Sequence, residues 1–195
     1  RKVSPDMQRT ISLLTTHNKG RYGKTHRQTS ASWKSEGRYK YESFSHKEHA
    51  FSSLHELYEI LCASEEDHAT NPIRGGLAPD ANPERHNRIR RKEGNRGHIT
   101  ERDTAWTVFD LDEGIELPFT ASASNPQHLK EAARYVRDAL AQKDPVFVDT
   151  SVIVQWTSSA GISETSDERL GEFRKIKARV WALLDREVCG DSLSK

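Results

Sequence analysis

Two aspartates stand one residue apart at the end of the most strand-like segment of the chain, "WTVFDLDEG" (residues 106–114). In a strand, Asp110 and Asp112 point to the same side, because side chains alternate with a period of two. Their like charges repel each other, so a bound cation is the obvious group to offset the repulsion. Mg²⁺ and Mn²⁺ prefer carboxylate oxygens. The spacing therefore predicts a site for a hard divalent cation.

Two later segments each bring another polar group to an expected strand end. The β-branched stretch "SVIVQWTSS" runs into Ser158 and Ser159, and "KARVWALLD" ends in Asp185. If the strand at 105–110 neighbours these two in one sheet, the three ends converge on a single point. Asp185 then completes the protein side of a two-metal site. Such sites serve phosphoryl or nucleotidyl transfer, because the ions stabilise both the attacking and the leaving oxygen.

Periodicity and capping signals indicate the elements that must position these groups. Helical spacing in "AFSSLHELYEILCAS" predicts a helix capped by Ser52 or Ser53, and Asn125 followed by Pro126 predicts the start of another. The remaining expected elements are strands at 9–16 and 38–44 and a short helix over 166–176. This mixture predicts the α/β (α+β) class.

The composition indicates a globular domain and gives no sign of a disulfide-rich or membrane-spanning protein. The chain has 195 residues, 30% of them charged, and a formal net charge of +1, which suits one substantial domain with a polar surface. Cys62 and Cys189 lack C-x-x-C spacing, so a disulfide framework is not expected and a reduced, cytoplasmic setting fits. No apolar run has the length of a membrane span, so we expect no membrane partner.

The order of these segments resembles a known family. A hydrophobic strand with D-x-D, a strand with a Ser-rich turn and a strand ending in Asp look like the core of the archaeo-eukaryotic primase superfamily. The closer likeness is to the primase-polymerase domains of plasmids, phages and integrative elements. It rests on "WTVFDLDEG", "VIVQWTSSAG" and "KARVWALLDRE" and covers roughly residues 105–187, with "IRGGLAPD" matching more loosely.

The resemblance implies a fold and a domain plan. We expect a primase-polymerase-like core, with a mainly antiparallel sheet, an RRM-like half and flanking helices. Residues 1–195 would form a single catalytic domain cut from a longer protein. Its N-terminal αβ portion would span 1–104, with a basic loop at 84–102, and its RRM-like catalytic portion would span 105–195.

The resemblance also implies an activity. Asp110, Asp112 and Asp185 match the catalytic, metal-binding motifs, which would hold two Mg²⁺ or Mn²⁺ ions. The chain would then be a nucleotidyltransferase, a DNA primase or DNA-directed polymerase. Its partners would be a single-stranded DNA template, nucleoside triphosphates and a helicase, fused or separate. The setting would be replication of a mobile element in the cytoplasm of a bacterial or archaeal host.

The middle motif departs from the family pattern. Ser158, Ser159 and Ala160 occupy a nucleotide-binding stretch that normally includes a histidine, and Ala160 stands where that histidine is expected. Natural divergence and an engineered His-to-Ala change both remain open. In either case Lys177 and Arg179, which alternate along the following strand, are suited to hold triphosphate oxygens.

A local basic stretch is the candidate template-binding segment. A loop of this kind either binds nucleic-acid backbone, with salt-sensitive affinity, or is simply solvated. Its residues are Arg85, Arg88, Arg90, Arg91, Lys92 and Arg96.

Two other functions remain possible. "VFDLDEG" also looks like the first motif of haloacid-dehalogenase-type phosphatases, in which Asp110 would be the nucleophile. A catalytically inactive nucleic-acid-binding module of a replication initiator would keep the fold and the basic loop without using the triad. The intact triad argues against this last reading, and the missing histidine argues for it.

The positions of the histidines and tryptophans indicate structural roles rather than metal binding or base stacking. His46 and His49 would share one face of a helix, but no third ligand lies nearby, so no zinc is expected. Trp106, Trp156 and Trp181 fall within expected strands, where core packing is a better explanation than base stacking.

Overall fold

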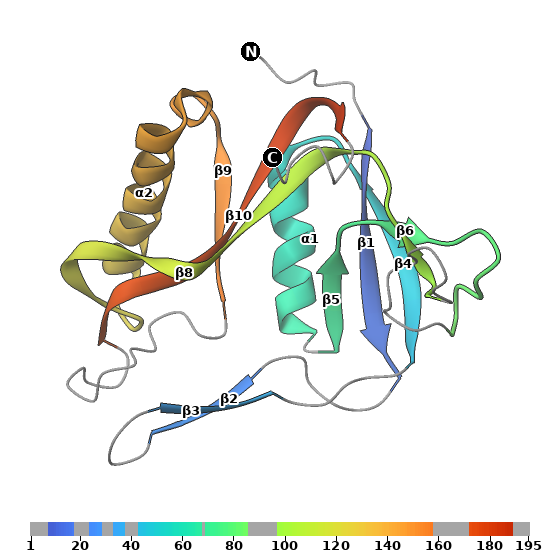
Figure 1. The fold of residues 1–195 in the computed structure, drawn as a ribbon, viewed down its shortest axis with the longest axis horizontal. Helices are drawn as coiled ribbons and strands as arrows, with labels where there is room; N and C mark the ends of the chain where they lie inside the picture. Colours follow the sequence, from blue (N-terminus) through green and yellow to red (C-terminus); the bar gives the residue numbers. More distant parts are fainter. Residues whose placement is uncertain are drawn as a thin grey trace. The chain divides into compact units, whose positions relative to one another are not determined.

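The computed structural model describes residues 8–17, 24–28, 33–37, 43–67, 69–85, 97–157 and 172–188. These residues form a mixed α/β fold with antiparallel sheets and two α-helices, which confirms the α+β class (Figure 1). The backbone of β2 (Lys24–Gln28) and β3 (Trp33–Gly37) forms an antiparallel hairpin. No helix among the described residues is long and apolar enough to cross a membrane.

The chain divides into two compact units. The first contains Arg1–Tyr22, Arg38–Thr107 and Leu183–Lys195, and the second contains Gly23–Gly37 and Val108–Ala182. Both units are discontinuous in sequence, whereas the plan expected from the resemblance divides the chain once, after residue 104.

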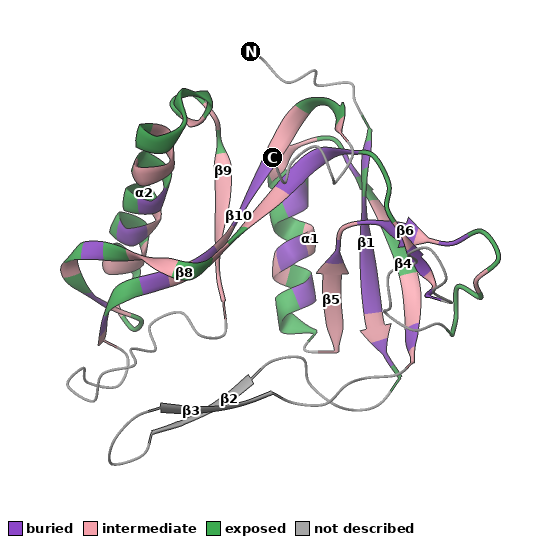
Figure 2. Cartoon of the chain, in the orientation of Figure 1, coloured by how far each residue is buried: buried purple, intermediate pink, exposed green. Residues whose placement is uncertain are grey.

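The first unit is built on a three-stranded antiparallel sheet in the order β4-β1-β5. Its strands are β1 (Arg9–Thr16), β4 (Phe44–Phe51) and β5 (Thr70–Ile73). The strand expected at 9–16 is confirmed. The one expected at 38–44 is not: β4 begins at Phe44, and residues 38–42 lie outside the described part. Figure 2 shows β1 buried along most of its length, so this strand forms the centre of the unit.

Each face of this sheet is covered by a different element. On one face, Leu14, Phe44 and Ile73 pack against Ile99 of β7 (Ile99–Thr100), which pairs with β6 (Gly76–Leu77). The helix α1 (Leu54–Glu66) buries Leu57 and Leu61 within the same unit. Because β1 is covered from both sides, its residues from Ile11 to Leu14 are buried in consecutive positions rather than alternately.

The start of α1 is fixed by two hydrogen bonds between Glu56 and the serines before it. The Ser53 hydroxyl accepts from the Glu56 backbone N–H at 3.1 Å, and the Glu56 carboxylate accepts from the Ser52 backbone N–H at 2.7 Å. The carboxylate reaches the residue before the cap, one position earlier than in a capping box, and the Ser52 hydrogen bonds lower the pKa of Glu56. Of the two caps expected from the sequence, Ser53 is the one that the helix uses.

A buried arginine holds the strands of the first unit together. Arg9 is 3% exposed. Its guanidinium donates to the carbonyls of Ala105 at 3.0 Å, Ser52 at 3.3 Å and Leu184 at 3.2 Å. The Trp106 indole N–H donates to the Thr10 carbonyl at 2.8 Å. Segments that are far apart in the sequence are therefore joined through polar groups inside the core.

His46 and His49 lie on strand β4 and not on a helix, so the expected helical placement is wrong. Residues three apart on a strand point to opposite faces, and the two rings therefore do not converge. His46 shares a hydrogen bond with the Ser12 hydroxyl, with 3.1 Å between Nε2 and Oγ. Burial lowers the pKa of His46 below its ordinary value of 6.5; Glu48 opposes this shift and Arg102 adds to it.

This lowered pKa predicts acid sensitivity of the first unit. Below about pH 6.5 the unfolded chain takes up a proton at residue 46 that the folded chain takes up only at lower pH. The free energy of unfolding will therefore fall as the pH drops from 7 towards 5, by at most about 1.4 kcal/mol per pH unit for this group. Urea titrations at several pH values measure the slope. His46→Gln should flatten it, and an unchanged slope in that variant would assign the effect to other groups.

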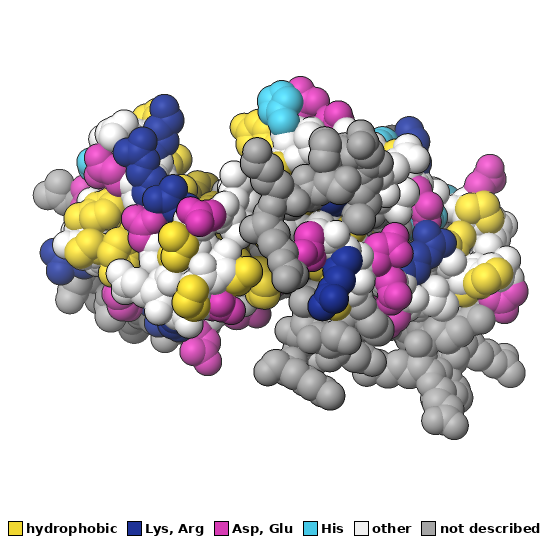
Figure 3. All heavy atoms as spheres, turned by 90° about the horizontal axis from the view of Figure 1, so that it is seen from above, with side chains coloured by type: hydrophobic (Ala, Val, Ile, Leu, Met, Phe, Trp, Pro, Cys, Tyr) yellow, Lys and Arg dark blue, Asp and Glu magenta, His cyan; other side chains and the backbone are white. Residues whose placement is uncertain are grey.

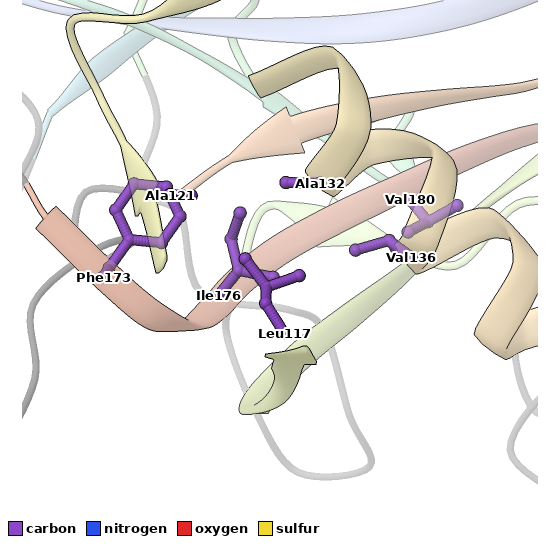
Figure 4. Close-up of a cluster of buried hydrophobic side chains, with 7 residues drawn as sticks. All are labelled: Leu117, Ala121, Ala132, Val136, Phe173, Ile176 and Val180. Atoms are coloured by element: carbon purple, nitrogen blue, oxygen red, sulfur yellow. The ribbon is translucent and has the colours of Figure 1, made fainter. Parts of the chain in front are cut away.

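The second unit contains a sheet in the order β8-β10-β9 backed by α2 (Pro126–Lys143). Its strands are β8 (Thr104–Ser122), β9 (Val152–Trp156) and β10 (Glu172–Val188), of which β9 and β10 pair antiparallel. The start of β8, up to Thr107, and the end of β10, from Leu183, are counted with the first unit. Figure 4 shows Ala132 and Val136 of α2 packed against the buried side chains of the strands. The predicted cap at Asn125 and Pro126 at the first helical turn are confirmed.

Two strand boundaries expected from the sequence are wrong. β8 does not end at Asp110 but continues to Ser122, and β10 begins at Glu172, within the expected helix, and continues past Asp185 to Val188. Residues 166–171 lie outside the described part. In both strands apolar residues that face α2 continue beyond the expected limits, and burial of these side chains keeps the chain extended. Neither β8 nor β10 therefore ends at its aspartate.

Candidate functional site

The two aspartates lie on the face of the second sheet that points away from α2. Phe109 and Leu111 of β8 pack against the apolar cluster beneath α2. Because neighbouring strand residues point to opposite faces, Asp110 and Asp112 lie on the other side, and both are exposed. The sequence expectation that the pair shares one face agrees with this pattern.

Strand β10 places two basic residues on this same face. Ile176 and Val180 belong to the cluster under α2, so Lys177 and Arg179 point to the opposite side by the same alternation. Arg179 Nε donates to Asp110 Oδ2 at 3.3 Å. The two side chains are 39% and 43% exposed. The pair thus joins neighbouring strands on a solvent-accessible surface.

Strand β9 adds a glutamine that sequence reasoning missed. Gln155 is the direct cross-strand partner of Arg179, and its Oε1 accepts a hydrogen bond from the Trp181 indole N–H at 2.9 Å. Val154 and Trp156 pack against the α2 cluster, so Gln155 faces the aspartate side. The signal in the sequence was one polar residue within the β-branched run "VIVQW".

A glycine bends β8 directly after the aspartates. Gly114 has φ +75°, and a Cβ placed on it would lie 3.1 Å from the Ile176 carbonyl oxygen. Asp112 and Glu113 are exposed in succession, as are Arg174 and Lys175 on β10. In β8, Leu111 and Ile115 on either side of the glycine both pack towards α2, so the alternation is kept. In β10, Phe173 and Ile176 both pack there, so the alternation slips by one residue, as it does at a β-bulge.

Asp185 belongs to the first unit. It is exposed and lies on β10, six residues beyond Arg179. Asp110 and Asp112 belong to the second unit. The part of Asp185 in a metal-binding triad stays a prediction.

Several predicted residues lie outside the described part of the chain. These are Ser158, Ser159, Ala160, Arg88, Arg90, Arg91, Lys92 and Arg96. The segment before the serines is described: the Thr157 N–H and hydroxyl both donate to the Lys177 carbonyl at 3.3 Å. The chain thus enters the Ser-rich stretch beside Lys177. Arg85 is exposed.

The donor set fits a magnesium or manganese ion that also binds a substrate. Within the described ranges, no three His, Cys, Asp or Glu side chains gather as a metal-holding group. Mg²⁺ does not require such a cage, since it commonly takes one or two protein carboxylates and completes its octahedron with water and substrate phosphates. Asp110 and Asp112 supply two hard oxygen donors on one accessible face.

Charges of both signs meet at this face. On it, Asp110 pairs with Arg179, and elsewhere on the described surface acidic and basic side chains are also interspersed, as the view from above shows (Figure 3). Carboxylates bind cations, and arginine and lysine bind phosphate oxygens. A ligand that combines a divalent cation with a polyphosphate therefore complements the face as a whole.

Comparison with protein-family models, with curated proteins and with solved structures finds no match for this chain.

Proposed function

We propose that the chain is the catalytic domain of a primase-polymerase that transfers nucleotides onto a growing strand. Its substrates are nucleoside triphosphates and its template is single-stranded DNA. The observation that carries the proposal is the combination of Asp110 and Asp112 with Arg179 on the open face of a helix-backed sheet. A carboxylate pair beside phosphate-binding cations is the arrangement that metal-dependent nucleotidyl transfer requires.

Each residue of the site has a role in this proposal. Asp110 and Asp112 hold one or two Mg²⁺ or Mn²⁺ ions, and Asp185 provides the third carboxylate of the resembled family. The ions supply Lewis-acid activation of the 3′-hydroxyl and charge neutralisation at the leaving pyrophosphate. Arg179 and Lys177 orient the triphosphate through charge-assisted hydrogen bonds, together with the stretch from Ser158 to Ala160.

The remaining partners follow from the resemblance. Arg85 and the basic residues between 88 and 96 contact the template backbone, so that template affinity falls with salt. A helicase, fused or separate, opens the duplex. The setting is the replication of a plasmid, phage or other mobile element in the cytoplasm of a bacterial or archaeal host.

A metal-dependent incorporation assay tests the proposal. The protein is incubated with single-stranded DNA, labelled ribo- or deoxyribonucleotides, and Mg²⁺ or Mn²⁺, and products are resolved by length. We expect extension or de novo products that disappear with EDTA. Hydrolysis of p-nitrophenyl phosphate without any polymer would instead favour the phosphatase. DNA binding without either activity would favour the inactive initiator module.

A further inference from the structure

The ion pair between Arg179 and Asp110 bears on how the site takes up its ligands. Among the described residues, neither side chain makes another hydrogen bond or ion pair. Arg179 donates to Asp110 through Nε, and among the described residues its two terminal nitrogens have no acceptor, so an incoming ligand can first bind there. A guanidinium in this arrangement can bind a phosphate in bidentate fashion.

Arg179 competes with a metal ion for the carboxylate of Asp110. A divalent cation that binds the Asp110 carboxylate must displace the Arg179 contact or accept a second positive charge beside it. Exposed ion pairs contribute little to stability, because solvent and salt screen them. The Arg179–Asp110 contact can therefore be broken at little cost. Until a ligand binds, Arg179 acts as the counterion of Asp110.

We propose that Arg179 is an exchangeable counterion that couples metal binding to nucleotide binding. Without nucleotide, Arg179 neutralises Asp110 and weakens its affinity for the metal. When a triphosphate binds, Arg179 turns its guanidinium to the phosphate oxygens and releases Asp110 for the metal. By thermodynamic reciprocity, the metal then strengthens nucleotide binding by the same factor. This inference rests on the proposed function, since it takes Asp110 as a metal ligand.

The test measures Mn²⁺ affinity directly, by calorimetry or by electron paramagnetic resonance of free Mn²⁺, at low salt and without nucleotide. Arg179→Met should bind Mn²⁺ roughly two- to fivefold more tightly than the wild type, the factor that corresponds to an exposed ion pair. The Mn²⁺ affinity of Arg179→Lys should lie between those of the wild type and Arg179→Met. Arg174→Met is the matched control: Arg174 lies on the same strand but donates to Thr120 Oγ1. The Arg174→Met substitution removes one positive charge and leaves the ion pair of Asp110 intact.

A second titration adds a non-hydrolysable nucleoside triphosphate. In the wild type it should tighten Mn²⁺ binding more than in Arg179→Met, because only the wild type has a contact to release. Equal Mn²⁺ affinity in the wild type and Arg179→Met, with binding lost in Asp110→Asn, would overturn the inference and leave the proposed function standing. If Asp110→Asn binds Mn²⁺ as the wild type does, the metal site itself fails, and the proposed function fails with it.

Discussion

Replacing Asp110 and Asp112 together by asparagine will lower the rate of nucleotide incorporation by about a hundredfold or more. The change keeps the shape of both side chains and removes the charge that holds a divalent cation. Metal ions contribute several kcal/mol of transition-state stabilisation, and each 1.36 kcal/mol corresponds to a tenfold rate. Single-turnover primer extension with Mg²⁺ or Mn²⁺ measures the loss.

Folding and template binding should survive this double substitution. Both side chains are exposed, and exposed substitutions usually change stability by no more than about 0.5 kcal/mol. Asp138→Asn is the matched control, because Asp138 is exposed on α2 of the same unit and pairs with Arg137. Template affinity, followed by fluorescence anisotropy, should stay close to that of the wild type in both proteins. Undiminished synthesis in the double variant would eliminate the mechanism.

Arg9→Met will destabilise the protein by about 3 kcal/mol or more. The buried guanidinium of Arg9 donates hydrogen bonds to three backbone carbonyl groups. A buried polar group that loses its partner costs about 1–3 kcal/mol, and methionine offers no donor to replace the guanidinium. Arg9→Lys keeps the charge but not the planar fork, so its loss of stability should be smaller yet clear.

Urea unfolding followed by circular dichroism measures these differences. Arg174→Met provides the comparison, since Arg174 is an exposed arginine at a strand position with one side-chain hydrogen bond. Its free energy of unfolding should stay within about 0.5 kcal/mol of the wild type. An unchanged unfolding midpoint in Arg9→Met would show that water replaces the guanidinium and that the three bonds contribute little.

Local signals predicted the helix starts and the first strand correctly. Ser53 and Asn125 act through hydrogen bonds within one turn of helix, so neighbouring residues alone determine them. The length of β8 was not predicted, because Gly114 after two aspartates looks like a turn. In the structure this glycine takes a positive φ inside a strand that continues. Only pairing with the neighbouring strand distinguishes such a position from a turn.

The candidate site was predicted in part for a related reason. Alternation along one strand is a local property, and it put Asp110 and Asp112 on one face. The contact of Asp110 with Arg179, and the place of Gln155 beside Arg179, depend on strand register. Register is set by the burial of whole faces, so no short segment of sequence reveals it. The start of β10 at Glu172 was missed because Phe173 and Ile176 have the spacing of a helix.

The contacts of Arg9 also constrain the order in which the protein can fold during synthesis. Its guanidinium needs the carbonyl of Leu184, which the ribosome makes after all of Val108–Ala182 in the second unit. Nascent domains usually fold as units, with the N-terminal one first. Here the unit that contains the first strand waits for residues made later than the whole of the other unit. The second unit is therefore the one that can finish folding first on the ribosome.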